Sequence, residues 1–344
     1  MNNVKNQNIK KIAIIKLSAL GDIVHAMLGL QILKKHFPNL QIDWIVEESF
    51  AEVLRNNHDI DNILCLNLKR LKKSPSKIFI ELKKIRKYKK NSYDLIIDAQ
   101  GLIKSGLCTF LLGKNSVGFD KNSIREKLAS IFYKQKISLA YDENTIIRNL
   151  TIFLEPFDIE FNKNMILDKK PFLGFKNEDK IIYDYLSKKN PKKQKNIIFI
   201  IGATWESRCY PKEQLLKLAF LLKENILIAW GNEEEKTRAL WLEKHCEFVK
   251  ALPKLDLNSL KAIISKCDLL IGNDTGPTHL AWGLNVPSIT LFGPTPVSRV
   301  YETISNKVLK SASKVNHFKL DKNDFSISQI QEKDINTLAK KLFH

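Results

Sequence analysis

The chain has 344 residues, of which 44% are hydrophobic, and its formal net charge at pH 7 is +19. This length favours two domains over one, and the scattered, odd number of cysteines argues against a disulfide framework or a zinc site. Because no apolar segment is long enough to cross a bilayer and residues 1–10 contain no apolar signal core, we expect a cytoplasmic protein, at most peripheral to a membrane.

The first predicted elements are a strand at residues 11–17 and a helix that ends near Phe37. Between them, Gly21 allows a sharp turn and Asp22 lies where the helix would begin. A carboxylate at the tip of the first strand of an α/β sheet points into the crevice where such folds bind ligands. Taken alone, Asp22 is explained as a helix cap, so its functional role depends on the motifs that follow.

The rest of the first half contains predicted strands at 41–46, 63–66 and 94–99, with a long helix at roughly 76–91. The turn Asp59-Ile-Asp61 formally matches an Asp-x-Asp metal motif. A short turn rich in Asp and Asn is its ordinary explanation. No other cluster has the spacing of metal ligands, so we predict that the protein needs no metal and no cofactor.

Positive charge is concentrated in three clusters at residues 69–73, 83–90 and 188–195. We interpret the third as a solvated linker. Nucleic acid and anionic lipid are the competing partners for the first two. Since no helix-turn-helix, zinc-finger or aromatic RNA-binding signature is present, we expect no nucleic acid and favour an anionic lipid surface. The candidate lipid-facing residues of the first cluster are Lys69, Arg70, Lys72 and Lys73.

The alternation of apolar strands with helical stretches predicts parallel sheets of βαβ units. We expect a first domain at 1–165, a linker region at 166–195, a second domain at 196–328 and a closing helix within 329–344. The predicted strands of the second domain are 196–201, 226–230, 269–271 and 288–292, and its predicted helices are 211–223, 233–246, 257–266 and 276–284.

A second strand-loop-helix signature spans residues 268–282. Pro277 suits the first turn of the helix. The amides that follow Thr275 would face an anion, and the helix dipole would favour a phosphate there. His279 falls in the same first turn, so its ring could reach that anion.

Together these ordered motifs resemble the ADP-heptose:lipopolysaccharide heptosyltransferases of glycosyltransferase family 9. The resemblance extends over nearly the whole chain, and the segments that carry it are Lys16–Asp22, Asp43–Glu48, Asp98–Ser105, Arg125–Tyr133, Trp230–Gly231, Asn273–Gly276 with His279, and Leu291–Thr295. The second and third segments look like the type I branch, which adds the first core heptose, rather than type II. The resemblance implies the GT-B architecture, two Rossmann-like domains facing across a cleft, with a closing helix that crosses back to the first domain.

The resemblance also implies an inverting transfer of heptose from ADP-L-glycero-D-manno-heptose to the Kdo sugar of Kdo-lipid A. A sugar hydroxyl is a poor nucleophile at pH 7, and a positioned carboxylate can take its proton as bonding develops. Asp22 is the candidate base. Without a metal, the charge on departing ADP would fall to helix amides and cationic side chains.

The residues that match the family's site positions divide into two groups. The donor-binding group is Thr204, Arg208, Glu235, Leu255, Asp274, Thr275, Gly276 and His279. The acceptor-binding group is Lys16, Gly21, Lys104 and Arg125, together with the cluster Lys69, Arg70, Lys72 and Lys73. The chain departs from the family pattern at Ala203, where relatives can have Thr, and at Arg208, where they can have Lys. A guanidinium still binds phosphate, but one hydroxyl contact is lost.

Simpler explanations exist for several of these residues. Glu235 could only open a helix in an acidic run, Leu255 could be a core leucine, and Asp274 could cap its loop. For the cationic residues the alternative is surface solvation. At the level of function, the alternatives are a second heptosyltransferase, a nucleotide-sugar epimerase, a two-domain small-ligand binding protein, or a basic nucleic-acid binder.

Overall fold

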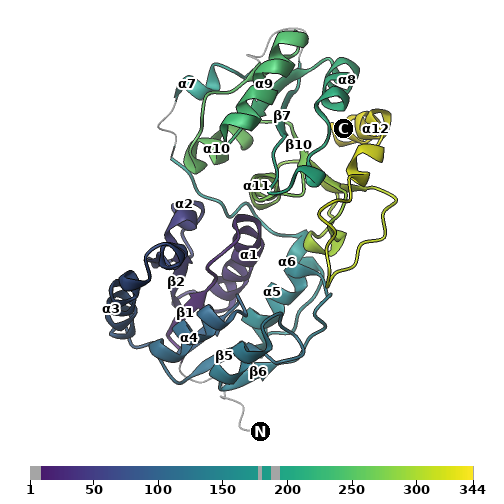
Figure 1. Ribbon diagram of the computed structural model, residues 1–344. Helices are drawn as coiled ribbons and strands as arrows, with labels where there is room; N and C mark the ends of the chain where they lie inside the picture. Colours follow the sequence, from purple (N-terminus) through teal and green to yellow (C-terminus); the bar gives the residue numbers. More distant parts are fainter. Residues whose placement is uncertain (1–8, 177–179, 187–193, 344) are drawn as a thin grey trace. The chain divides into compact units, whose positions relative to one another are not determined.

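The computed structural model describes residues 9–176, 180–186 and 194–343. They belong to two compact units, Met1–Gly174 and Phe175–His344, each with its own sheet (Figure 1). The boundary falls inside the predicted linker region at 166–195. Most of the third basic cluster, namely residues 188–193, lies outside the described residues.

The first unit contains a six-stranded parallel sheet in the order β3-β2-β1-β4-β5-β6. The strands are β1 (Lys11–Ile15), β2 (Gln41–Glu47), β3 (Asn62–Leu66), β4 (Leu95–Asp98), β5 (Ser116–Phe119) and β6 (Gln135–Ile137). This is the Rossmann order, in which the direction of winding reverses between β1 and β4. Loops that leave the carboxyl ends of these two strands therefore flank the usual ligand position of the fold.

The α-helices in the described part of the first unit are α1 (Leu20–His36), α2 (Ala51–Leu54), α3 (Ile78–Lys89), α4 (Ile103–Leu112), α5 (Thr145–Leu154) and α6 (Asn164–Leu167). The central strands are buried on both faces, which explains why β1 reads as a continuous apolar run. On one face α1 packs on α5. Gly29 makes this packing close, because a Cβ at that position would lie 2.2 Å from the Phe153 ring.

The second unit repeats the same winding in the order β12-β11-β10-β7-β8-β9, again with all neighbours parallel. Its strands are β7 (Asn196–Ile200), β8 (Asn225–Ala229), β9 (Val249–Ala251), β10 (Leu269–Asn273), β11 (Ser288–Phe292) and β12 (Asn306–Lys310). The reversal lies between β7 and β10. The loops after these two strands are the ones that carry most of the predicted donor residues.

The helices of the second unit are α7 (Lys180–Tyr183), α8 (Lys212–Leu222), α9 (Glu233–His245), α10 (Leu257–Ile264), α11 (Gly276–Leu284) and α12 (Glu332–Leu342). The closing helix α12 buries Ile335 and Ala339 in the core of this unit and packs on α8 (Figure 1). Its apolar stripe is therefore used within the second unit, and the return to the first domain that the resemblance implies stays a prediction.

The helix content has one bearing on membranes. Within the described residues, no helix combines the length and the hydrophobicity needed to cross a bilayer.

Candidate active site

The loop between β1 and α1 is held in place by one side chain from the neighbouring strand. Gln100, which follows β4, accepts hydrogen bonds at Oε1 from the backbone amides of Leu17 and Ser18, both at 2.9 Å. Because β1 and β4 are the strands at which the winding reverses, Gln100 fixes the loop at the ligand position of the fold. Sequence reasoning included Gln100 in a motif but gave it no role.

Asp22 lies in the first turn of α1, as the third helical residue rather than at the N-cap. One oxygen, Oδ2, accepts a hydrogen bond from the Ala19 amide at 3.3 Å, so the side chain does help to cap the helix. Among the described residues, no donor is hydrogen-bonded to Oδ1. The carboxylate is half-buried. One oxygen therefore orients the group while the other is left for a ligand.

Lys16 has a different place from the one predicted for it. Its side chain is buried beneath the loop, where Nζ donates to the Ala99 carbonyl at 2.7 Å and lies 3.4 Å from the side-chain oxygen of Asn149. Burial lowers the pKa of Lys16, and the carboxylates of Asp22 and Asp98 oppose that shift. Because the ammonium is committed to protein oxygens, Lys16 supports the loop from below rather than presenting an exposed charge.

Asp98 shapes the turn that carries Gln100. Its carboxylate is fully buried and accepts hydrogen bonds from the Tyr133 hydroxyl at 2.7 Å and from the amides of Gln100 and Gly101 at 2.8 and 3.1 Å. Gly101 has a φ of +68°, a conformation that side chains disfavour. This turn is why the motif that begins at Asp98 needs both its acid and its glycine.

Five other predicted acceptor residues lie on the surface of the first unit, and these are Lys69, Arg70, Lys73, Lys104 and Arg125. Gly21 is buried in the first turn of α1. Lys104 and Arg125 are exposed. They lie near each other in the fold because Glu126 accepts a hydrogen bond from the Ile103 amide at 2.7 Å, at the start of α4.

The basic cluster at 69–73 occupies a 3₁₀ turn, η2 (Lys69–Lys72), after β3. Buried Glu47 holds this turn by accepting a hydrogen bond from the Lys69 amide at 3.0 Å. Lys69 Nζ lies 4.1 Å from the Phe50 ring centroid, and Arg70 and Lys73 are exposed. The side chain of Lys72 lies outside the described residues.

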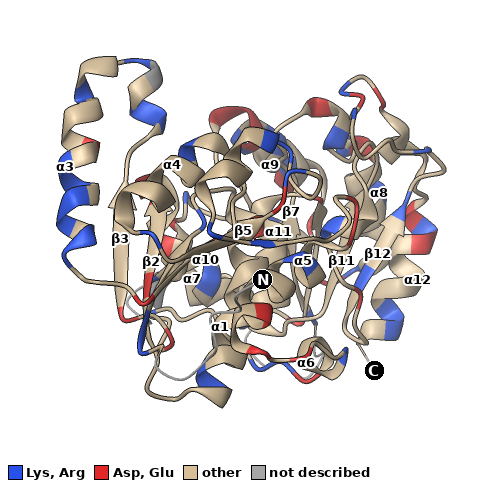
Figure 2. Ribbon diagram, turned by 90° about the horizontal axis from the view of Figure 1, so that it is seen from below, with Lys and Arg blue, Asp and Glu red and all other residues tan. Residues whose placement is uncertain are grey.

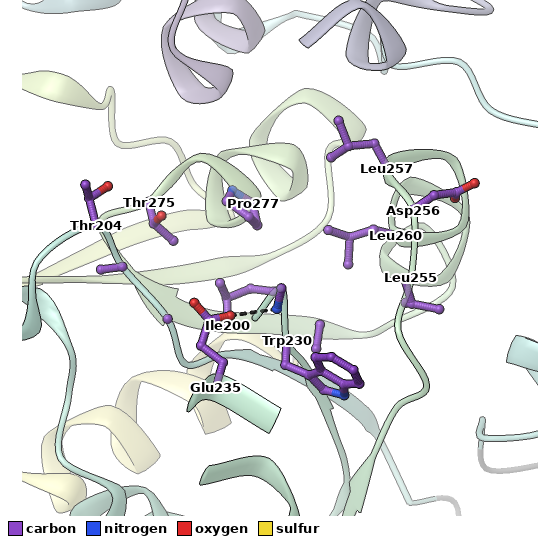
Figure 3. A pocket seen from close by; sticks show the side chains of 14 residues that line it. Ile200, Thr204, Trp230, Glu235, Leu255, Asp256, Leu257, Leu260, Thr275 and Pro277 are labelled. Atoms are coloured by element: carbon purple, nitrogen blue, oxygen red, sulfur yellow. Dashed lines mark hydrogen bonds between the residues drawn. The ribbon is translucent and has the colours of Figure 1, made fainter. Parts of the chain in front are cut away.

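In the second unit a pocket of about 390 Å³ opens at the carboxyl ends of the strands (Figure 3). Four predicted donor residues line it, and these are Thr204, Glu235, Leu255 and Thr275. The remaining lining is mostly apolar, with Ile200, Gly202, Ala203, Ala229, Trp230, Gly231, Asp256, Leu257, Leu260 and Pro277. An apolar wall with a few polar groups suits a planar ring joined to a polar chain.

Glu235 is held at one side of this pocket. Its Oε2 accepts a hydrogen bond from the Gly231 amide at 2.7 Å (Figure 3). Its Oε1 accepts one from the Asn232 side chain at 2.9 Å. A Cβ on Gly202 would lie 2.0 Å from Oε1, so any larger residue there would displace the carboxylate from this position. Leu255 lies in the same lining, as Figure 3 shows, so neither residue is explained by helix opening or core packing alone.

Asp274, after β10, is the centre of a buried polar cluster. Its side chain is 3% exposed, and its oxygens lie 2.9 Å from Arg208 Nη2 and 3.3 Å from His279 Nε2. Thr295 donates to it at 2.7 Å, and Arg299 lies 3.4 Å away. Burial alone would raise the pKa of Asp274, but the hydrogen bond from His279 and the two guanidinium charges outweigh it and hold the pKa well below its ordinary value.

This arrangement brings together residues that the sequence predicted as one site. Arg208 and His279 meet at Asp274, all three from the predicted donor-binding group. Because its oxygens accept from protein donors, the Asp274 carboxylate positions these two side chains, and its contact with the donor stays a prediction. Thr295 and Arg299 were missed. The motif at Leu291–Thr295 was the available signal for Thr295, whereas Arg299 stands in no recognised pattern.

The loops after β7 and β10 are joined by Asn273. Its side chain donates to the Ile201 carbonyl at 2.9 Å and accepts from the Tyr210 amide at 3.0 Å. The helix α11 begins beside them, with Thr275 as N-cap and Pro277 in the first turn. The first amides of a helix have no intrahelical partners and favour an anion. The pocket thus has an apolar end, a carboxylate and an anion-binding helix start.

Comparisons with known proteins agree with this geometry. The family Glycosyltransferase family 9 (heptosyltransferase) matches residues 82–325. Lipopolysaccharide heptosyltransferase 1 of Campylobacter coli is 39% identical over 97% of this chain and 99% of its own length. The protein of the same name from Pseudomonas aeruginosa is 30% identical over 83% of this chain and 79% of its own length.

A known structure has the same fold. Escherichia coli heptosyltransferase WaaC with ADP-2-deoxy-2-fluoro heptose has a TM-score of 0.77 at 24% identity, over 96% of this chain and 99% of that one. The two Rossmann-like units are therefore those of a GT-B enzyme. Fold, site geometry and sequence similarity agree, and the chain belongs to glycosyltransferase family 9, the heptosyltransferases.

Proposed function

We propose that this protein transfers L-glycero-D-manno-heptose from ADP-heptose to the Kdo sugar of Kdo-lipid A, with inversion, and so adds the first heptose of the inner core. The names of the relatives from C. coli and P. aeruginosa support this activity. The observation that carries the proposal is the pocket of the second unit, where an apolar wall, the Glu235 carboxylate and the start of α11 line one space.

In this proposal the donor occupies that pocket from end to end. Adenine packs against Leu255, Leu257 and Leu260, and the ribose hydroxyls donate to Glu235. The diphosphate lies at the start of α11, near the amides of Thr275 and Gly276. The hydroxyl of Thr204, which lines the pocket and is exposed, is available to the same phosphates.

Arg208 and His279 act on the leaving group as it gains charge. Both are oriented by Asp274, so little reorganisation is needed when the bond to ADP breaks. Although the Asp274 carboxylate offsets one positive charge, Arg299 lies beside it as well, which leaves the cluster cationic. No metal enters this scheme, and the same cluster supplies the stabilisation that a cation would otherwise give.

Asp22 is the proposed general base of the reaction. Its oxygen Oδ1 takes the proton of the attacking Kdo hydroxyl while Oδ2 stays on the Ala19 amide. Lys16 and Gln100 keep the loop in place beneath it. The value of the carboxylate is mainly positional, because it holds the proton acceptor next to the nucleophile.

The proposed acceptor is recognised by exposed cations of the first unit. Lys104 and Arg125 are suited to the Kdo carboxylates and lipid phosphates, and Lys69, Arg70 and Lys73 to an anionic leaflet. We place the enzyme at the cytoplasmic face of the inner membrane as a peripheral protein.

The test is incubation of the protein with ADP-heptose and Kdo-lipid A, followed by mass spectrometry. We expect the acceptor to gain the mass of one heptose. A gain only on an acceptor that already carries one heptose would instead indicate the second heptosyltransferase. Conversion of ADP-heptose without an acceptor would indicate an epimerase or hydrolase.

A further inference from the structure

Large hydrophobic side chains are exposed on three neighbouring elements of the first unit. They are Phe79 and Ile80 at the start of α3, Ile103, Leu107 and Phe110 on α4, and Leu128 and Ile131 on the 3₁₀ segment η4 (Lys127–Phe132). We call these seven residues the apolar face. Phe79 is 75% exposed, Ile131 67% and Phe110 61%. Single exposed apolar residues are ordinary, but a group of this size on adjoining elements indicates an interaction surface.

The helix α4 packs against both η4 and α3, so the three elements that carry the apolar face adjoin one another. Gly106 of α4 lies so close to η4 that a Cβ would be 2.7 Å from the Phe132 ring. The rings of Phe110 and Phe132 have centroids 6.1 Å apart. The helix α4 also packs on β4 of the sheet. Its exposed apolar residues are spaced four and three apart, which places them in one stripe along the helix.

Cations surround this face. The exposed side of α3 carries Lys83, Arg86, Lys87 and Lys89, which Figure 2 shows in blue along the helix. The one carboxylate of α3, Glu81, is buried, accepts the Asn67 amide at 2.9 Å and pairs with Lys84 at 3.3 Å. It therefore adds little negative charge to the surface. Exposed Lys104 and Arg125 lie near the start of α4.

This combination fits one class of partner better than the others. A protein interface core is depleted in lysine. Nucleic-acid binding relies on base stacking, for which five of the seven residues of the face, being isoleucine or leucine, are unsuited. Ile and Leu beside Phe, rimmed by Lys and Arg, are instead the composition of segments that lie in the boundary of an anionic bilayer. The side chains enter the acyl region while the cations remain at the phosphates.

We propose that the apolar face is a membrane-insertion surface for an anionic phospholipid leaflet, with Phe79, Phe110 and Ile131 inserted below the headgroups. This surface would give the protein a means of attachment at the peripheral location proposed above. Its biological purpose rests on the proposed function. Electrostatic attraction to the basic rim brings the protein to the leaflet, and apolar burial then retains it. The two contributions are separable, because only the first is screened by salt.

The test is co-sedimentation with vesicles of phosphatidylcholine containing 30% phosphatidylglycerol, chosen to represent an anionic leaflet. The variant Phe110→Ser/Ile131→Ser should bind about tenfold or more weakly, since two apolar side chains no longer insert. The matched control is Ile304→Ser/Phe325→Ser, which removes the same residue types from exposed positions of the second unit. The control should bind as the wild type does.

A second variant separates charge from insertion. Lys83→Gln/Arg86→Gln/Lys87→Gln should lose about fivefold in binding per charge at low salt, and much less at high salt. Insertion itself is measured by Ile131→Trp with brominated acyl chains. We expect more fluorescence quenching than in the wild type, which contains five tryptophans.

Three outcomes would overturn the proposal. The first is unchanged vesicle binding by Phe110→Ser/Ile131→Ser. The second is an equal loss of vesicle binding by the matched control Ile304→Ser/Phe325→Ser. The third is a wild-type protein that is a dimer in sedimentation velocity, together with a Phe110→Ser/Ile131→Ser variant that is a monomer but still binds vesicles. This result would make the apolar face a contact between two copies of the chain.

Assays of transfer keep this inference distinct from the proposed function. On vesicle-embedded Kdo-lipid A, Phe110→Ser/Ile131→Ser should be slower than the wild type, while on deacylated, water-soluble acceptor the two should be equal. Loss on the soluble acceptor as well would mean misfolding and would count against the insertion surface. If the wild type binds vesicles as expected but transfers heptose to neither acceptor, the proposed function fails and the surface stands.

Discussion

The two units have the same strand order, yet Asp22 and Asp274, the two carboxylates that the sequence analysis assigned to the site, are in opposite states. Asp22 follows β1, is half-buried and accepts one backbone hydrogen bond. Asp274 follows β10, is almost wholly buried and is engaged by two arginines, a histidine and a threonine. The two carboxylates follow different strands of the shared order, since β10 corresponds to β4 rather than to β1. Asp22 is thus available to a substrate, whereas Asp274 is committed to protein donors, which is why only Asp22 is the proposed base.

The largest expected effect is on Asp22, the available carboxylate. Asp22→Asn should keep the fold and the affinity for ADP, because an amide oxygen can still accept from the Ala19 amide. Loss of a general base costs about 10²–10⁴ in rate. Single-turnover measurements with saturating donor, beside thermal unfolding of the same preparation, check this. Near-normal turnover would remove Asp22 from the base role, and an unfolded variant would favour capping as its main task.

The same substitution in the second unit should affect stability first. Asp274→Asn leaves buried Arg208 without its carboxylate, and breaking a buried pair in this way costs about 3 kcal/mol or more. Urea unfolding of the two proteins at pH 7 measures the difference. The conservative partner change Arg208→Lys should cost less than Asp274→Asn. Equal stability of Asp274→Asn and the wild type would show that the cluster is not a structural unit.

Acid titration sharpens this point. The folded pKa of Asp274 is depressed, so its contribution to stability is present above the unfolded pKa of about 4 and is lost as the pH falls toward the folded value. We therefore expect the free energy of unfolding to fall more steeply below pH 4 in the wild type than in Asp274→Asn. Parallel curves would contradict the assignment of a low pKa to this group.

The pocket can be tested through its glycine. In Gly202→Ala, the added methyl would lie 2.0 Å from Oε1 of Glu235, so the carboxylate must move. ADP binding by calorimetry should weaken by about tenfold, the loss of one good hydrogen bond to a charged group. Gly231→Ala is the comparison, because its methyl would lie 3.6 Å from the same carboxylate, an ordinary contact. If both variants bind ADP alike, Glu235 does not hold the ribose.

A smaller effect is expected from the support of the first loop. Gln100→Ala removes the oxygen that holds the amides of Leu17 and Ser18, so Asp22 should be less well placed. We expect kcat to fall by about tenfold with the KM for ADP-heptose unchanged. Gln100→Glu retains an acceptor oxygen and should recover most of the rate. If only the KM for ADP-heptose changed, Gln100 would act on donor binding and not on the placement of Asp22.

The accuracy with which the sequence predicts an element of this fold depends on how deeply the element is buried. Central strands such as β1 and β10 are continuous apolar runs, and both were predicted to within two residues. Edge strands β6 and β9 have three residues each and no readable period, so they were missed, as was α4. Packing against neighbours, rather than local pattern, determines such short elements.

Site residues also divide into those that local sequence locates and those that long-range packing determines. Positions fixed by the backbone, such as Asp22 after β1 and Thr275 at the start of α11, were located from local sequence. Partnerships across the chain were not, because Arg299 reaches Asp274 from a segment with no motif. The burial of Lys16 was also hidden, since a lysine at a strand end is expected to be exposed. Long-range contacts decide these roles.

The smallest expected effect is that of removing divalent ions. It tests whether the buried cluster around Asp274 is sufficient to neutralise the leaving diphosphate. Arg208, Arg299 and His279 are gathered around one carboxylate, and the first turn of α11 adds its amides. Asp61, in the turn that resembles a metal motif, already accepts the Ile42 amide at 2.7 Å and pairs with Lys34 at 3.4 Å. Turnover in excess EDTA should therefore stay within about twofold of the untreated rate, a difference under 0.5 kcal/mol in the barrier. Complete loss of activity that magnesium or manganese restores, and that Asp61→Ala reproduces, would show that a cation rather than this cluster neutralises the leaving diphosphate.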